Sequence, residues 1–420
     1  MITKSVKRLP AENGISGWEA ISRRSLPIRS LDGNVTADWL IIGAGFAGLS
    51  AARRLLQLRP DDKIVVLDAS EIGKGTSGRN SGFMIDVPHN LSSSEYSSGG
   101  LDATRLEMAQ NRAAIAFAKE AADEYGMSAD TFDAAGKINA AATARGMKLN
   151  ISFSQSLRSA GEKHMFFDAA EMRDITGSDY YLGGLFTPGA VLIQPADYVR
   201  DFAAGLSHRL DIFERSPVTS LTREGGTWTA GSTRGKVIAP NVILGVNGHI
   251  TDFGHFGGRL MHIFAYASMT APFPAEDLGR RISGRDRWAL LPADAMGATV
   301  RKITSGGQSR IVIRTKYTYE TAITVSDRRM AKMAEEHRNS LDARFPGLKD
   351  IPFEHSWAGR LCLSRNHVPA FGALDQGLYS ACCENGLGTV KSTLAGIMAA
   401  ELATGTTSQH LEQYSDQPAP

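Results

Sequence analysis

The chain has few cysteines: only Cys362, Cys382 and Cys383 occur among its 420 residues. This scarcity excludes a disulfide framework, and the adjacent Cys382 and Cys383 lack the usual spacing of metal ligands. No hydrophobic run approaches the length of a membrane span, and no apolar stretch follows the basic residues at the start, as a secretory signal would require. We therefore expect a cytoplasmic protein with no metal and no membrane span.

Neither sign of charge is in excess. Lys and Arg number 46, Asp and Glu number 44, and the formal net charge is +2. This balance gives no reason to expect a nucleic-acid partner. A hydrophobic share of 42% and a charged share of 21% are typical of a soluble globular protein. The length exceeds what one simple core organises, so two domains are expected.

A glycine-rich turn near the start is the first feature that indicates function. Residues 39–42 are an apolar run typical of a buried parallel strand, and residues 48–58 are typical of a small-residue helix. Between them lies Gly43-Ala-Gly-Phe-Ala-Gly48, a GxGxxG pattern. Gly43 permits the tight turn, Gly45 lets the backbone approach a pyrophosphate, and Gly48 lets the helix pack close to the strand. The helix N-terminus then offers N–H groups to an anion.

A carboxylate at suitable spacing supports dinucleotide binding. Residues 63–68 form a second apolar run that ends in Asp68, 20 residues after Gly48, where an acid can bind ribose hydroxyls. The alternative is a structural turn in an unrelated α/β protein. No second complete GxGxxG is present. The sequence therefore indicates one nucleotide cofactor and no separate NAD(P)H site.

Two further glycine-rich stretches could approach a ligand. Residues 75–82, Gly-Thr-Ser-Gly-Arg-Asn-Ser-Gly, combine glycines with hydroxyl side chains that can donate to it. The alternative for this stretch is an ordinary surface loop. Near the end, a buried strand over 378–383 is followed by Gly386-Leu-Gly388 and a helix over 389–403. This closing unit has the same order of elements as the opening one: a strand, a glycine-rich turn and a helix.

Together, the opening motif, the 75–82 loop, the 241–248 segment and the closing 386–396 stretch resemble the D-amino-acid-oxidase-like (DAO) family of FAD-dependent oxidoreductases. The resemblance covers most of residues 37–405 and is nearest to its gamma-glutamylputrescine oxidase and sarcosine oxidase branch. It implies an α/β fold with a Rossmann-like FAD-binding domain of the glutathione-reductase type. It also implies a second, mixed-sheet α+β substrate domain that covers the flavin ring.

The resemblance implies that both domains are discontinuous. The FAD-binding domain is expected over residues 37–90, 190–252 and 352–408, and the substrate domain over 91–189 and 253–351. Residues 1–36 are expected to form a polar N-terminal arm over the surface, with Trp18 as its large apolar anchor.

The resemblance also extends the set of FAD-binding residues. It implies pyrophosphate and flavin contacts from the 75–82 loop, an adenine contact from the backbone of Val218, and contacts to the flavin's pyrimidine edge from the 386–391 turn. Asp68 stands where the family usually has Glu. The expected FAD-binding residues are Gly43, Ala44, Gly45, Phe46, Ala47, Gly48, Asp68, Ala69, Ser70, Gly75, Thr76, Ser77, Arg79, Asn80, Ser81, Gly82, Val218, Asn247, Gly248, Gly386, Leu387, Gly388, Thr389, Val390 and Lys391.

Two residues are candidates for chemistry. Lys391 lies in a first helical turn, where a cation is disfavoured by the helix dipole, which suggests an anion nearby. The resemblance implies that a lysine in this turn binds substrate carboxylate, although aligning the flanking glycines places Val390 at that position. An exposed lysine is the alternative. Cys362 lies in a Gly-x-x-Cys context similar to that of the flavin-linked cysteine of sarcosine oxidase. It is a candidate for a covalent flavin link, and a buried structural cysteine is the alternative.

The expected substrate domain supplies further candidates. Phe264 and Tyr266 share one face of an expected strand over 263–270 and are candidate substrate contacts, with ordinary core packing as the alternative. The resemblance implies a lysine near the flavin that promotes reaction with oxygen, but the matching position is Val312. Lys302 and Arg310 are candidates to replace that charge.

These observations predict a soluble FAD-dependent oxidoreductase that oxidises the C–N bond of a small amine or N-substituted amino acid. Hydride would pass to the flavin, the imine would hydrolyse, and O2 or another acceptor would take the electrons. Two alternatives remain: an FAD-dependent 2-hydroxy-acid dehydrogenase on the same fold, and a noncatalytic FAD-binding subunit. The lack of an obvious acid–base pair keeps the last one open.

Overall fold

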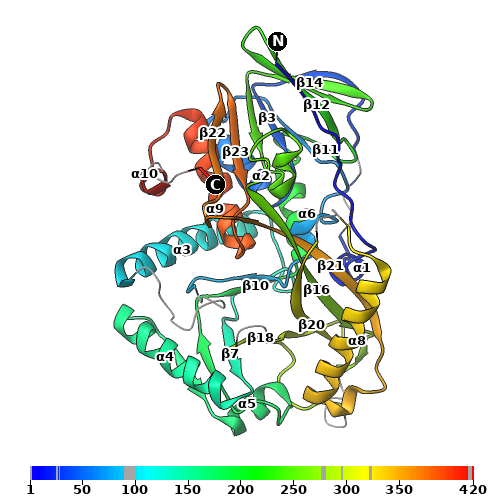
Figure 1. Cartoon of the computed structure of the whole chain (residues 1–420), viewed down its shortest axis with the longest axis vertical. Helices are drawn as coiled ribbons and strands as arrows, with labels where there is room; N and C mark the ends of the chain where they lie inside the picture. The colour runs from blue at the N-terminus through cyan, green and yellow to red at the C-terminus, as the bar shows by residue number, and fades with distance from the viewer. Residues whose placement is uncertain are drawn as a thin grey trace.

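The computed structural model describes residues 2–24, 27, 29–88, 100–275, 281–294, 297–320, 324–414 and 419–420. Figure 1 shows two regions along the long axis, with both termini in the upper one. The domain boundary expected at residues 90 and 91 lies outside the described residues. The helix α3 (Gly100–Glu124) lies on the left of Figure 1, at the level between the two regions.

A six-stranded sheet forms the centre of the upper region. Its first five strands are parallel, and the sixth is antiparallel to its neighbour. The strands β3 and β4 are buried along their whole length, as expected for strands covered on both faces. The sheet order is β11 (Asp211–Phe213), β4 (Ile64–Leu67), β3 (Trp39–Ile42), β15 (Asn241–Leu244), β23 (Leu378–Cys382) and β22 (Ala370–Asp375).

The opening and closing helices pack against each other. They are α2 (Phe46–Leu58), which begins two residues before the predicted start, and α9 (Gly388–Thr404). A Cβ atom on Gly396 would lie 2.1 Å from the Ala47 carbonyl oxygen, so the two helices can approach this closely only at a glycine. A Cβ on Gly48 would lie 1.8 Å from the Gly43 carbonyl oxygen. Gly48 therefore allows the close helix–strand packing that its position in the motif predicts.

The N-terminal segment does not form the expected surface arm. It supplies both edge strands of a five-stranded sheet, because residues 2–5 pair antiparallel with residues 220–223 and residues 33–36 pair parallel with residues 235–238. Trp18 is fully buried, and Leu31 is 2% exposed. The sheet order is β1 (Ile2–Ser5), β12 (Val218–Glu224), β13 (Thr227–Ser232), β14 (Gly235–Ala239) and β2 (Gly33–Thr36).

The lower region is built on a nine-stranded mixed sheet. Its residues alternate between two faces: Leu290 packs with Ile138 and Ala298, whereas Leu291 packs with Phe83 and Ile85. The order is β21 (Phe353–Ser364), β16 (Leu260–Thr270), β20 (Gln308–Tyr319), β19 (Thr299–Ser305), β18 (Trp288–Pro292), β7 (Lys137–Ala141), β9 (Gly183–Thr187) and β8 (Met165–Phe167), with β17 (Phe273–Pro274) paired to β20.

A three-stranded sheet and the remaining helices complete the fold. The small sheet lies where the 75–82 loop ends, and its order is β5 (Phe83–Met84), β10 (Val191–Ile193) and β6 (Phe132–Asp133). The parallel sheet and the separate mixed sheet confirm the predicted fold class. The other helical elements are α1 (Gly17–Ala20), α4 (Ala144–Ala160), α5 (Ala169–Thr176), α6 (Pro195–Leu206), α8 (Asp327–Arg344), α10 (Gln409–Tyr414), η1 (Thr76–Gly78), η2 (Asn247–Thr251) and η4 (Pro346–Leu348).

Candidate functional site

Three of the predicted stretches lie at one edge of the six-stranded sheet. Gly43, Asp68, Gly245 and Cys383 each follow directly from the carboxyl end of a parallel strand. Ligands of open α/β sheets bind outside these carboxyl ends. Gly43 has a φ of +104°, and its N–H donates to the Leu67 carbonyl at 2.7 Å. The opening turn is therefore held by the neighbouring strand.

Asp68 connects the opening turn to its own loop. Its Oδ2 accepts from the Ala44 N–H at 2.8 Å, and its Oδ1 accepts from the Ser70 N–H at 2.9 Å. Burial raises the pKa of Asp68. Oδ1 also accepts from the Ser70 hydroxyl at 3.2 Å, so Oδ2 is the oxygen that can accept a second hydrogen bond from a ribose hydroxyl. Ser216 N–H donates to the Asp68 carbonyl, which places the start of β12 at Val218 close by.

The 75–82 loop lies directly against the opening turn. Ser77 Oγ accepts from the Phe46 N–H at 3.2 Å, and a Cβ on Gly45 would lie 2.6 Å from this oxygen. Gly45 thus leaves room for the second loop. Asn80 stabilises the loop, because its Nδ2 donates to the Ser77 carbonyl and its Oδ1 accepts from the Gly82 N–H, each at 2.7 Å.

The Arg79 side chain is directed away from the opening turn. Its guanidinium is buried and donates to the Asn13, Gly14 and Ala358 carbonyls. Glu12 lies 3.4 Å from its Nε. Arg79 therefore connects the loop to the N-terminal segment and to β21. Its predicted role toward FAD would have to come from the backbone.

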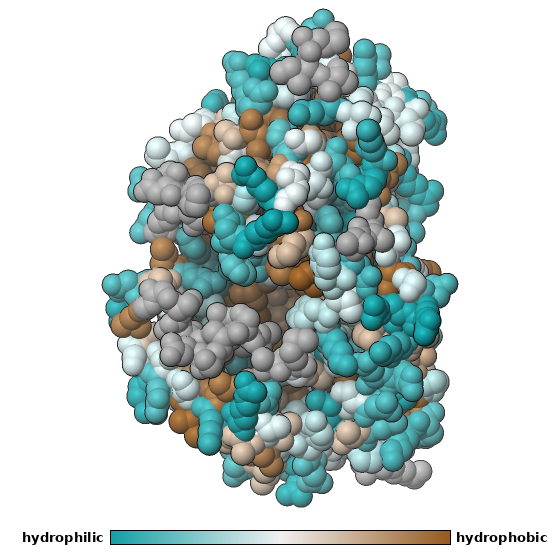
Figure 2. All heavy atoms as spheres, viewed as in Figure 1, coloured by the Kyte–Doolittle hydropathy of each residue, from teal (hydrophilic) through white to brown (hydrophobic). Residues whose placement is uncertain are grey.

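The closing turn lies beside the end of the same loop. Thr389 donates its hydroxyl hydrogen to the Phe83 carbonyl. A Cβ on Gly386 would meet no atom within 4 Å, so this turn faces open space. Leu387 packs against an apolar cluster of Phe83, Ile85, Leu192, Ala289 and Leu291. Figure 2 shows a hollow with hydrophobic residues on its floor near the middle of this side of the molecule.

Glu384 and Lys391 flank this turn. Glu384 is 5% exposed, and neither of its carboxyl oxygens has a hydrogen-bond partner. Burial raises the pKa of Glu384 to about 8, against the opposing charge of Lys391. Lys391 forms an ion pair with Glu107 on α3, with Nζ 3.1 Å from Oε1. Val390 is fully buried against the core between α9 and α2. Substrate binding by Lys391 stays a prediction.

Arg301 is a buried cation that the sequence did not single out. It is 5% exposed, and its Nη1 donates to the Ser81, Gly82 and Ile193 carbonyls. Burial lowers the pKa of Arg301 to about 9. The only signal in the sequence was a charged side chain within the segment that forms β19. Arg301 pairs across the sheet with Val312, the position where the resemblance implies a lysine.

The two proposed replacements for that lysine point elsewhere. Lys302 donates to the Arg285 carbonyl at 2.8 Å, and Arg310 forms an ion pair with Glu354. Because neighbouring strand residues alternate between faces, Lys302 cannot share the face of Arg301.

Cys362 is buried and lies next to the 247–248 turn. Its Sγ donates to Cys383 Sγ at 3.1 Å, and a Cβ on Gly248 would lie 3.2 Å from Cys362 Cβ. Asn247, with a φ of +49°, begins the short helix η2. His249 follows in η2 and is 6% exposed, with Asp252 and Arg360 as partners. Burial and Arg360 lower the pKa of His249 to about 4.

Phe264 and Tyr266 do share a strand face, but that face packs against α8. They form a buried cluster with Val325, Met333 and Ala358. The opposite face of β16 carries Ala267 and Met269, which pack with Trp18. The structure therefore does not bring Phe264 and Tyr266 together with the other predicted site residues.

The features around the closing turn fit a bound flavin nucleotide. Glu384 and the Nε of Arg301 are buried without hydrogen-bond partners. The glycine turn opens toward space beside an apolar wall. A flavin combines a polar pyrimidine edge with a flat apolar ring, and its nucleotide part matches the opening turn with Asp68.

The described helices include none that is long and apolar enough to cross a membrane. Over the same described residues, no cluster of three or more His, Cys, Asp or Glu side chains could hold a metal ion.

Comparison with known proteins gives consistent results. The sequence is 26% identical over 381 residues to a probable oxidoreductase, OrdL, of Haemophilus influenzae, covering 88% of this chain and 83% of that one. It is 24% identical over 405 residues to gamma-glutamylputrescine oxidoreductase of Escherichia coli, covering 94% and 90%. The fold matches the crystal structure of glycine oxidase from Geobacillus kaustophilus with a TM-score of 0.71 and 18% identity, covering 92% and 100%. The model of the DAO family, FAD dependent oxidoreductase, matches residues 38–402, and the chain belongs to this family of FAD-dependent enzymes.

Proposed function

We propose that this oxidoreductase oxidises the C–N bond of a small amine or N-substituted amino acid. The names of its relatives support this class, since one acts on gamma-glutamylputrescine and a structural neighbour acts on glycine. The observation that carries the proposal is the meeting of three glycine-rich turns beside an apolar wall and a buried arginine. A cytoplasmic location remains part of the proposal.

The opening turn and Asp68 would hold the adenosine and pyrophosphate part of FAD. The 75–82 loop and the closing turn would hold the flavin end, and Val218 would meet the adenine. When bound, the flavin accepts a hydride equivalent from the carbon beside the substrate nitrogen. The N-terminus of α9 carries partial positive charge, which stabilises negative charge at the flavin's pyrimidine edge.

Glu384 is suited to move a proton at this site. An amine must be neutral before it can lose a hydride, and a buried carboxyl group with a pKa of about 8 accepts a proton in its ionised form, which dominates above about pH 8. We assign to its Oε atoms the removal of a proton from the substrate ammonium. Arg301 would keep the Ser81 and Gly82 backbone in place beside the reacting centre.

Flavin reduction by substrate panels tests the proposal. The purified flavoprotein is mixed anaerobically with N-methyl amino acids and polyamines, and in parallel with 2-hydroxy acids, while the flavin absorbance is followed. Bleaching by the amine panel alone is the expected result. Bleaching by hydroxy acids alone would favour the dehydrogenase alternative, and bound flavin that neither panel reduces would favour a noncatalytic subunit. Repeating the reaction in air, with and without a quinone, identifies the electron acceptor.

A further inference from the structure

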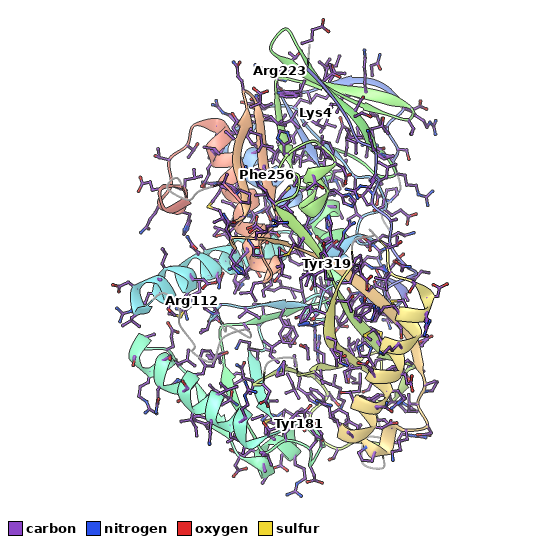
Figure 3. The ribbon with its side chains drawn as sticks, in the orientation of Figure 1. Lys4, Arg112, Tyr181, Arg223, Phe256 and Tyr319 are labelled. Carbon is purple, nitrogen blue, oxygen red and sulfur yellow. The ribbon has the colours of Figure 1, made fainter. Side chains whose placement is uncertain are left out.

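A pocket lies on the outer face of the nine-stranded sheet, away from the turns described above. Its floor includes Ala140, Pro292 and Ala298. Ala140 and Ala298 belong to the cluster that contains Leu290, on the face opposite to Leu291 and Phe83. Pro292 shares that face with Leu290 because strand residues alternate. The cavity volume is about 450 Å³. Figure 3 places Tyr181, one of its lining residues, in the lower region.

One end of this pocket, here called the outer pocket, offers hydrogen-bond donors. The Arg344 guanidinium lies over the Tyr180 ring, 4.3 Å from its centroid, and its Nη1 donates to the Ser340 carbonyl at 2.8 Å. The hydroxyl of Tyr181, which is 4% exposed overall, interacts with the Arg344 side chain, and neither this hydroxyl nor the Arg344 Nε has any other hydrogen-bond partner. Burial raises the pKa of Tyr181 to about 12, so the hydroxyl stays protonated. This end suits an anion.

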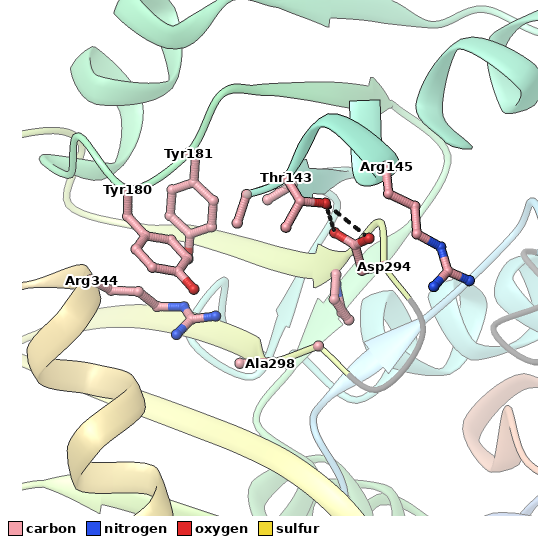
Figure 4. A pocket seen from close by; sticks show the side chains of 11 residues that line it. Thr143, Arg145, Tyr180, Tyr181, Asp294, Ala298 and Arg344 are labelled. Atoms are coloured by element: carbon pink, nitrogen blue, oxygen red, sulfur yellow. Dashed lines mark hydrogen bonds between the residues drawn. The ribbon is translucent and has the colours of Figure 1, made fainter. Parts of the chain in front are cut away.

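The other end offers a carboxylate. Asp294 accepts from the Thr143 hydroxyl at 2.9 and 3.1 Å, and Thr143 in turn caps α4 by accepting from the Gly146 N–H. A carboxylate has about four acceptor positions, so Asp294 can accept further hydrogen bonds. Figure 4 shows Thr143 and Asp294 on one side of the pocket, Tyr180, Tyr181 and Arg344 on the other, and Arg145 pointing away from Asp294. This end suits a cation.

From this arrangement we infer that the outer pocket binds a small zwitterion with α-amino-acid chemistry. The ligand's carboxylate lies near Arg344 and Tyr181, and its ammonium lies near Asp294. A simple anion would meet the Asp294 charge at one end, and a simple amine would meet Arg344 at the other. The sheet separates the outer pocket from the flavin turns, so the ligand is bound there and not oxidised. The inference is independent of the function proposed above.

Calorimetry on the flavin-loaded enzyme tests this inference, with ligands that leave the flavin absorbance unchanged. L-alanine, L-glutamate and L-phenylalanine are compared with propionate, glutarate and 3-phenylpropionate, which lack the amino group. We expect each amino acid to bind at least about tenfold more tightly than its deaminated partner. No binding at millimolar concentration, or equal binding of the two members of each pair, would overturn the inference without any variant being needed.

Three near-isosteric variants locate the site. Tyr181→Phe should weaken amino-acid binding about tenfold, since it removes one hydrogen bond to a charged group. Asp294→Asn should weaken amino-acid binding by a similar factor and should not weaken binding of the deaminated acids, because it removes the charge that repels them. Asp174→Asn, on an exposed position of α5, is the matched control and should change nothing. Unchanged binding in both pocket variants, with a normal flavin spectrum, would also overturn the inference.

Discussion

The guanidinium carbon of Arg301 lies 5.1 Å from the centroid of the Trp18 ring. Trp18 in turn donates its indole hydrogen to the Asn80 carbonyl at 2.8 Å, while Arg301 donates to the carbonyls of Ser81 and Gly82. The pair thus joins the N-terminal segment, the 75–82 loop and the nine-stranded sheet at one point. Both side chains are buried, so water cannot readily take over the hydrogen bonds that they donate.

Arg301→Met should loosen the 75–82 loop. The Ser81, Gly82 and Ile193 carbonyls lose the bond from Arg301, although Gly82 keeps its bond from the Ile193 N–H. A buried acceptor left unpaired costs about 1–3 kcal/mol. We expect a lower free energy of unfolding and loss of flavin during dialysis. Arg301→Lys keeps the charge but only part of the hydrogen bonding. Its stability and flavin retention should therefore lie between those of Arg301→Met and the unmodified chain. Urea unfolding and the flavin-to-protein absorbance ratio measure both effects. Full flavin retention and an unchanged midpoint in Arg301→Met would contradict this role.

Gly48→Ala should disrupt the opening turn. The new Cβ would lie 1.8 Å from the Gly43 carbonyl oxygen, so α2 would have to move away from β3. Overpacking of this kind costs about 1–3 kcal/mol, and we expect the purified variant to contain little flavin. Gly257→Ala is the control, because its Cβ would meet no atom within 4 Å and its φ is not positive. The idea fails if the two variants retain flavin equally.

Glu384 should make stability depend on pH. Its folded pKa of about 8 lies above the ordinary value of 4.5, so between these values the folded state binds more protons than the unfolded one. Stability from this group is therefore complete below about pH 4.5 and is lost as the pH rises through 8. Relative to Glu384→Gln, the unmodified chain should lose about 1 kcal/mol or more between pH 5 and 9, as one pKa unit corresponds to about 1.4 kcal/mol.

Urea unfolding of the two chains at several pH values measures this difference. The control is Glu335→Gln, at an exposed position of α8. A pH-independent difference between Glu384→Gln and the unmodified chain would show that folding does not raise the pKa of Glu384.

The flavin should be released by acid. Cys362 Sγ contacts Cys383 Sγ within a buried apolar cluster. The thiol therefore already has a hydrogen-bond partner and apolar packing, and we expect no covalent bond to flavin. After precipitation with trichloroacetic acid we expect a yellow supernatant and a colourless pellet. A yellow pellet that becomes colourless in Cys362→Ser would instead demonstrate the covalent link that the Gly-x-x-Cys context suggests.

Local patterns predicted the nucleotide-binding part well. The apolar run over 39–42 forms β3 with the same bounds, and Gly48 packs against Gly43 as its place in the motif requires. These features depend on neighbouring residues, whose geometry is set by a few backbone dihedrals. The structure of the N-terminal segment was harder to predict, since β1 and β2 form only by pairing with strands some 200 residues away. Ser5, for example, pairs with Ser220.

The sequence by itself determined a nucleotide cofactor, the parallel strands and the two glycine-rich helix starts, because hydrophobic periodicity and glycine spacing act over short distances. The resemblance to the DAO family then implied that the nucleotide is FAD. Only the tertiary structure decided which face of β16 packs against α8. That packing places Phe264 and Tyr266 apart from the other predicted site residues. It also placed Arg301, rather than Lys302, beside the 75–82 loop. Both outcomes depend on which layers cover each side of the mixed sheet. That choice is made by burial of apolar surface between segments far apart in the chain.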